Sequence, residues 1–149
     1  MTAIPTNLAE IIDEFNAVSD PEKLQILLEF SRQLPKLPER YDGHEEEMEQ
    51  VIECQTPLFL AVEVAEQAPF ETHIFFSAPA EAPTTRGFAG VLAEGLDGAP
   101  AQEILAVPDD IASELGLAKA ITPLRLRGMT AMLGRLKRNI KTQLQERNA

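Results

Sequence analysis

The chain has 149 residues, of which 44% are hydrophobic and 25% charged, so it is long enough for one domain with a core of its own, spanning 1–149. Thirteen lysines and arginines against 24 aspartates and glutamates give a net charge of -11, which argues against nucleic acid or an anionic membrane as a partner. A single cysteine excludes an intrachain disulfide, and two isolated histidines lack the spacing of zinc ligands, so we expect no metal.

The first third of the chain predicts two helices. The start of the chain has no basic residue ahead of an apolar block, so we expect no secretory signal and a cytoplasmic location. The first helix is indicated by apolar residues at the spacing of one helix face: Leu8, Ile11, Ile12 and Phe15. The second follows Ser19 as N-cap, with Pro21 in its first turn. It ends at Leu34, because Pro35 disfavours helical geometry in the residue before it.

The middle of the chain predicts a small sheet around the cysteine. Residues 58–64 and 72–77 are each expected to form a strand, and the short turn between them predicts an antiparallel hairpin. Val51 and Ile52 add a short third strand in this interpretation. Residues 54–57 form a loop, because Pro57 cannot donate a ladder hydrogen bond, and this loop is expected to present Cys54 at an exposed place.

The last part of the chain predicts only helices. Thr84 or Thr85 caps a helix that ends at Gly95, and its inner face includes Phe88, Val91 and Leu92. Pro100 and Pro108 begin two short helical segments. Thr122-Pro123 opens the final helix, whose apolar stripe comprises Met129, Met132, Leu133, Leu136 and Ile140. A clustered sheet with helices before and after it indicates an α+β fold.

Charge is unevenly distributed along the sequence. Seven of the 13 cations follow Pro123, where Glu146 is the only acid. They are Arg125, Arg127, Arg135, Lys137, Arg138, Lys141 and Arg147. The acidic run around residues 45–49 is interpreted as a solvated face.

Cys54 is the only soft nucleophile in the chain. It lies in a short polar interruption between apolar segments, where a partner could reach a thiolate. A free cysteine is also often buried as an inert small hydrophobe, so the residue type alone leaves both interpretations open. Glu53 beside it would raise the pKa of the thiol, so a nucleophilic role requires a cation nearby. The sequence has no cysteine-protease signature, glycine-rich phosphate loop or serine nucleophile elbow.

Three separated stretches resemble the SufE family of sulfur acceptors, in the same order. Residues 23–37 form a leucine-rich helix that ends in Gln-Leu-Pro-Lys-Leu-Pro. Residues 51–55 are similar to the family's cysteine motif, although Glu53 replaces its usual glycine and Thr56-Pro57-Leu58-Phe59 replaces the usual Ser-Gln-Val-Trp. Residues 121–129 are similar to the family's Leu-Thr/Ser-Pro-x-Arg-x-x-Gly-Leu opening of the last helix.

The resemblance implies an α+β domain with a small antiparallel sheet of about three strands flanked by helices. It implies that Cys54 lies on a loop tip beside a hydrophobic pocket and carries a persulfide received from a PLP-dependent, SufS-like cysteine desulfurase. Arg125 matches the family's arginine and is a candidate stabiliser of the thiolate, with a surface salt bridge as the alternative. Gln55 is a candidate contact for the loop or for the partner, with a solvated side chain as the alternative.

By the same resemblance, the sulfur passes on to an iron-sulfur scaffold complex like SufBCD. The chain would activate its partner without being an independent enzyme, would need no cofactor, and would be a monomer or weak homodimer. Two other classes of function remain open from the residues: a noncatalytic adaptor in which Cys54 is structural, and a thiol redox sensor.

Overall fold

The two N-terminal helices form where the sequence predicts them. The computed structural model describes residues 4–147, and in it α1 spans Thr6–Asn16 and α2 spans Asp20–Gln33. The hydroxyl of Ser19 donates to the Glu22 carboxylate at 2.9 Å, which fixes the start of α2. The helix ends at Gln33, because Pro35 disfavours helical geometry in Leu34.

The sheet has three antiparallel strands in the order β1-β2-β3: β1 (Glu49–Gln50), β2 (Phe59–Val64) and β3 (Thr72–Ser77). The expected hairpin is confirmed, and β3 has the predicted bounds. The third strand is predicted at Val51 and Ile52, and that position is wrong. Ile52 enters a 3-10 turn, so the ladder closes before it.

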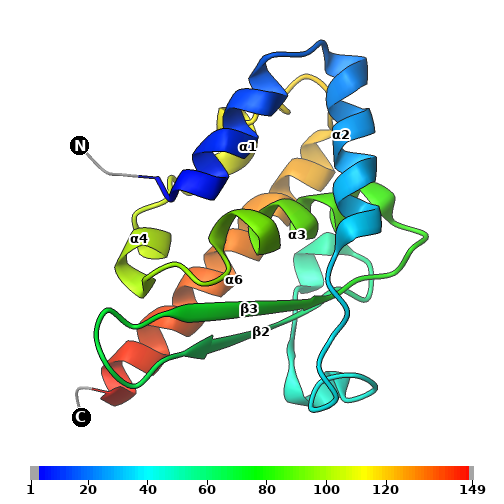
Figure 1. The fold of residues 1–149 in the computed structure, drawn as a ribbon. Coiled ribbons are helices and arrows are strands. Elements are labelled where there is room, and N and C mark those ends of the chain that lie inside the picture. Colours follow the sequence, from blue (N-terminus) through cyan, green and yellow to red (C-terminus); the bar gives the residue numbers. More distant parts are fainter. Residues whose placement is uncertain (1–3, 148–149) are drawn as a thin grey trace.

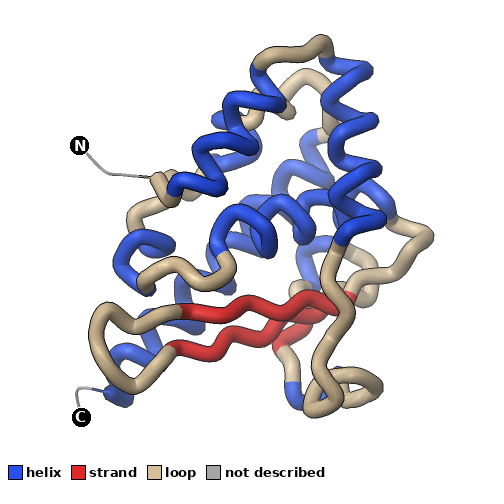
Figure 2. The backbone as a smooth tube through the Cα atoms, in the orientation of Figure 1, coloured by secondary structure: helices blue, strands red, loops and turns tan. Residues whose placement is uncertain are grey.

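One face of the hairpin belongs to the core. Its inward side chains form three cross-strand pairs, Leu60 with Phe76, Val62 with Ile74, and Val64 with Thr72, and all six residues are buried. Figure 2 shows the two long strands together at one side of the molecule, with the loop after α2 running past their end. The α+β class and the three-stranded antiparallel sheet are confirmed.

Helix α3 (Pro83–Leu96) lies at the centre of the fold, between the α1–α2 pair and the sheet (Figure 1). Phe88, Val91 and Leu92 are fully buried, as predicted. Neither Thr84 nor Thr85 caps this helix, because it already begins at Pro83. Gly95 does not end it either. It lies within the last turn, packed so closely on α1 that a side chain there would meet Leu8 at 2.9 Å.

The remaining helices are α4 (Ala101–Leu105), α5 (Ile111–Glu114) and the long α6 (Pro123–Arg147). Pro100 precedes α4 directly, whereas α5 begins three residues after Pro108, later than predicted. The predicted apolar stripe of α6 is confirmed, since all five of its residues are buried. Within residues 4–147, no helix has the length and apolar character needed to cross a membrane.

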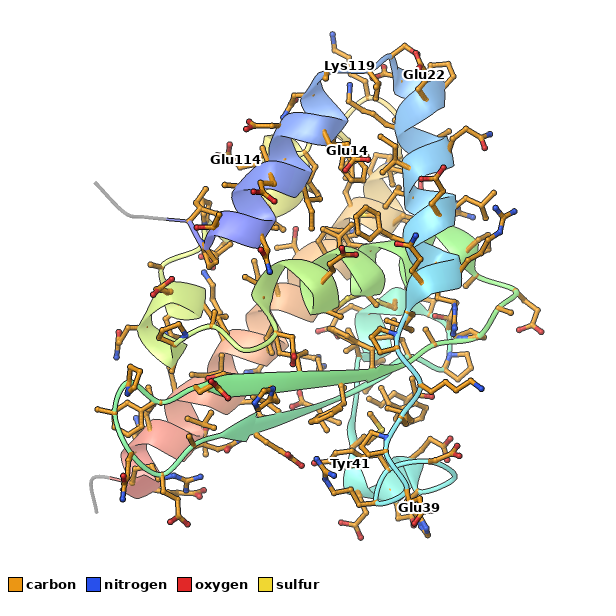
Figure 3. All side chains as sticks on the ribbon, in the orientation of Figure 1. Glu14, Glu22, Glu39, Tyr41, Glu114 and Lys119 are labelled. Carbon is orange, nitrogen blue, oxygen red and sulfur yellow. The ribbon has the colours of Figure 1, made fainter. Side chains whose placement is uncertain are left out.

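The long connection between α2 and β1 is tied to the outer face of the sheet. Figure 3 shows Glu39 and Tyr41 on this connection, far from Glu22 at the start of α2. The Tyr41 hydroxyl donates to Glu63 of β2 at 2.8 Å, and Arg40 donates to both oxygens of the same carboxylate at 2.7 Å. These hydrogen bonds anchor the connection to β2 before the chain enters β1 and the cysteine loop.

Candidate functional site

Cys54 ends a short 3-10 helix, η2 (Ile52–Cys54), between β1 and β2. The loop prediction is therefore confirmed, but the expected exposed position is wrong, because Cys54 is only partly accessible. The turn directs the side chain towards α6, where its thiol donates to the backbone oxygen of Gly128 at 3.5 Å. The thiol is thus withdrawn against a helix in this conformation.

The absence of a side chain at Gly128 permits this close approach. A Cβ atom at that position would lie 3.3 Å from both the Cα and the Sγ of Cys54. That spacing is tighter than ordinary van der Waals contact, so any larger residue would displace the loop. Glycine at this point of α6 is therefore a requirement of the closed cysteine loop.

Gln55, and not Glu53, carries the unusual backbone conformation of this loop. Gln55 has φ 57° and ψ 22°, in the left-handed region that favours glycine, whereas Glu53 lies inside the 3-10 turn. Glu53 replaces the glycine of the SufE-like cysteine motif, and its backbone needs no positive φ at that position. The Gln55 residue is exposed, and its role as a partner contact stays a prediction.

Three charged side chains connect the loop to the middle of α6. Arg135 donates from Nε and Nη2 to the two carboxylate oxygens of Glu53, at 2.9 and 3.1 Å, and from Nη1 to Glu49 at 2.9 Å. We call Glu49, Glu53 and Arg135 the Arg135 cluster. The guanidinium holds the pKa of Glu53 below its usual range, so this carboxylate is charged at neutral pH.

The surroundings of Cys54 keep the thiol protonated. Burial raises its pKa to about 11, the nearby charge of Glu53 raises it as well, and Arg135 opposes them. Because the thiolate is the attacking form, Cys54 is a poor nucleophile in this conformation. Chemistry at this sulfur requires either movement of the loop or a change in its electrostatic surroundings.

A cavity of about 330 Å³ opens beside the thiol. The cysteine loop, the segment that leads into α3 and the first turns of α6 line it, including Cys54, Thr84, Leu124 and Arg125. Arg125 donates from Nη1 to the Thr84 hydroxyl at 3.3 Å. Arg125 therefore shares a cavity with Cys54, but the cation that lowers the pKa of the thiol is Arg135. A thiolate-stabilising role for Arg125 stays a prediction.

Two large apolar side chains are exposed near the thiol. Ile52, on the same turn as Cys54, is 67% exposed, and Leu124, which lines the cavity, is 45% exposed. Exposed apolar side chains that lie together often mark a site of contact with another protein. The surface around Cys54 therefore has the composition of a contact surface.

Sequence reasoning missed Arg135 as a neighbour of the cysteine. The sequence indicated that a cation must offset the charge of Glu53, and Arg135 is one of the seven cations that follow Pro123. The pairing spans 82 residues, however, and nothing in the local pattern selects Arg135 over its neighbours. Arg138, three residues further along the same helix, also lies near enough for its charge to lower the pKa of Glu53, but only Arg135 donates hydrogen bonds to that carboxylate.

The chain is similar in sequence to one known family over most of its length. Residues 9–140 match the SufE family, described as an Fe-S metabolism associated domain. A SufE-like protein of Mycobacterium tuberculosis is 54% identical over 139 residues, which cover 93% of this chain and 94% of the relative. SufE-like protein 1 of Arabidopsis thaliana, named chloroplastic/mitochondrial, is 29% identical over 131 residues, 87% of this chain and 33% of the relative.

The fold is also found among solved structures. The solution structure of a hypothetical protein from Thermus thermophilus superposes with a TM-score of 0.82 at 35% sequence identity. The match covers 96% of this chain and 99% of that protein.

Proposed function

The chain belongs to the SufE family, a domain associated with Fe-S metabolism, and from this premise we propose that it accepts sulfur from a PLP-dependent, SufS-like cysteine desulfurase. Cys54 is the acceptor. The observation that carries the proposal is the position of this lone thiol on a short turn, beside a cavity and between exposed apolar side chains. A structural cysteine would need none of these surroundings.

The transfer is a thiol exchange at sulfur. The desulfurase presents a persulfide on its own cysteine, and the Cys54 thiolate attacks the outer sulfur of that persulfide. The new bond joins Cys54 Sγ to the transferred sulfur, while the bond between the partner's two sulfurs breaks. The partner's cysteine leaves as a thiolate and takes up a proton, and Cys54 releases its own proton before the attack. No external oxidant or reductant is consumed.

The closed loop supports the period between transfers. A persulfide held against α6 would be shielded from small thiols in solution, which would otherwise reduce it. The cavity beside Cys54 offers room for one more sulfur atom, and Arg125 on its wall would favour the negative charge of a persulfide. Gln55 lies at the tip of the same turn and is proposed to contact the loop or the partner.

The wider setting follows from the family. We place the chain in the cytoplasm, where thiols stay reduced, as an accessory protein that stimulates the desulfurase rather than an independent enzyme. It would act as a monomer or weak homodimer and pass sulfur to a scaffold complex like SufBCD. Ile52 and Leu124 would be covered by the desulfurase during transfer.

Stimulated turnover of the desulfurase tests the proposal. With cysteine as substrate, alanine release should increase on addition of the wild-type chain and stay at the basal rate with Cys54→Ser. An adaptor that acts by binding alone would stimulate equally with either variant, which would overturn the proposal. A redox sensor would instead form sulfenic acid with peroxide in the absence of any desulfurase, and that result would favour the sensor over the acceptor.

A further inference from the structure

We propose that Arg135 is a positioning residue that holds the cysteine loop closed through its ion pairs with Glu53 and Glu49, so that release of these pairs exposes Cys54. The inference deepens the proposed function and rests on it for its biological purpose. Loop closure itself can be measured on the isolated chain, without a desulfurase.

The Arg135 cluster joins the turn, and the strand that leads into it, to α6. Glu49 lies on β1, ahead of η2, and Glu53 is the direct neighbour of Cys54. The Arg135 side chain is only 17% exposed, and it donates three hydrogen bonds of 2.9 to 3.1 Å to these carboxylates. Arginine in a two-point contact with a carboxylate is among the stronger and more directional polar pairs, so it fixes the loop in one position.

Besides these ion pairs, the loop is held by partial packing of the Cys54 side chain against the core. The thiol of Cys54 reaches Gly128 over 3.5 Å, and Ile52 is mostly exposed and contributes little packing. The Thr56 hydroxyl oxygen is buried without a hydrogen-bond partner among the described residues, which penalises the closed conformation. Charge pairing therefore holds this segment together with the partial burial of Cys54.

The segment that would move has well-defined limits. Val51 and Leu58 on either side of it are completely buried, and the Val51 amide donates to the Leu58 carbonyl at 2.9 Å. Residues 52–57 can thus swing out as a unit while the sheet stays intact. A partner that presents charge to Glu53 or Arg135 would compete for these pairs and open the loop at the moment of docking.

Substitutions in the Arg135 cluster distinguish loop closure from simple electrostatics, because the two give opposite signs for Arg135→Gln. If Arg135 acted only as a nearby cation, its loss would raise the pKa of Cys54 and slow alkylation. If it holds the loop, its loss exposes the thiol and speeds alkylation. Glu53→Gln speeds the reaction in either case and serves as the positive control.

The experiment measures the rate at which iodoacetamide alkylates Cys54 in the full chain at one fixed pH. We expect Arg135→Gln and Glu53→Gln to react about three to ten times faster than wild type. The matched control is Lys141→Gln, which removes an exposed cation of α6 that makes no ion pair within residues 4–147, and it should react at the wild-type rate. A slower or unchanged Arg135→Gln would overturn the proposal.

Salt dependence keeps the test decisive if a variant is destabilised. Alkylation of wild type should accelerate between low and high potassium chloride, because salt weakens partly exposed ion pairs. The acceleration should be smaller in Glu53→Gln, in which the main pair is already lost. An equal salt response in both proteins would contradict the role of the cluster. Since no desulfurase is present, a negative result here leaves the acceptor role of Cys54 to its own test.

Discussion

The α2–α3 interface and the cysteine loop both depend on glycines that allow backbones to approach closely, yet they are held by different forces. At the first, a Cβ on Gly87 would clash with the Leu27 carbonyl oxygen, between two helices that bury apolar faces. At the second, Gly128 touches a mostly exposed turn that ion pairs tie to α6. We therefore expect the apolar contact between α2 and α3 to be permanent and the contact of the cysteine loop with α6 to be reversible.

The largest expected effect breaks the permanent contact. Gly87→Ala places a methyl group against a backbone atom that cannot move alone, so we expect a loss of about 3 kcal/mol in the free energy of unfolding. Urea denaturation measures it. Gly134→Ala is the matched control, since a Cβ there has nothing within 4 Å, and it should gain up to about 1 kcal/mol from helix propensity. Equal stability of the two variants would mean that α2 and α3 are not in close contact.

The pH dependence of alkylation tests how strongly the closed loop protects Cys54. Because the closed conformation raises the pKa of Cys54 from its ordinary 9.0 to about 11, closure favours the protonated thiol. The protonated Cys54 thiol therefore contributes its full share to the stability of the fold below pH 9, and this share is lost as the pH rises through about 11. At neutral pH the native chain should therefore be alkylated about 100 times more slowly than the chain unfolded in urea.

The shapes of the two rate profiles provide the check. The rate for the unfolded chain should level off near pH 9, while the native rate should continue to rise beyond it. If both profiles level off at the same pH, the thiol is not withdrawn in solution.

A methyl group at Gly128 tests the reversible contact directly. At 3.3 Å from Cys54 it should displace the loop rather than unfold the protein, because the turn can move by a few tenths of an ångström. We expect Gly128→Ala to speed alkylation about two- to fivefold, with stability changed by less than about 1 kcal/mol. Thermal unfolding and alkylation of the same samples measure both. A loss as large as that expected for Gly87→Ala would show that the loop is as firmly packed as the core.

The smallest expected effect concerns the backbone of the turn. Gln55→Gly removes the strain of a left-handed residue and should raise the free energy of unfolding by at most about 1 kcal/mol. Measured together with desulfurase stimulation, it separates two roles. Unchanged stimulation would mean that Gln55 serves the turn, and lost stimulation would mean that its side chain contacts the partner.

The regular parts of this fold were predictable because their signals are local. The apolar spacing of α1 and α6 and the proline after α2 indicated those helices, and β3 was predicted to the residue. The errors fall where long-range packing decides. A glycine near the end of an apolar pattern predicts the end of a helix, but Gly95 lies inside the last turn of α3, packed against Leu8 of α1.

The same limit applies to the site. The residues alone left Cys54 open between an inert and a reactive cysteine, and the family resemblance selected it as the candidate acceptor. The need for a cation near Glu53 followed from its position beside Cys54 in the chain. The sequence could not indicate that Arg135 is that cation or that the thiol is withdrawn, because both depend on how η2 lies on α6. Arg125, selected by resemblance, lines the cavity with Cys54, and its effect on the thiolate awaits measurement.

The intact mass of the chain after incubation with a cognate desulfurase and cysteine tests the acceptor role most directly. Wild type should gain one sulfur atom, located on the peptide that contains Cys54 and removed by a reductant, while Cys54→Ser should gain none. No added sulfur on wild type, or equal addition to Cys54→Ser, would contradict sulfur transfer through this cysteine.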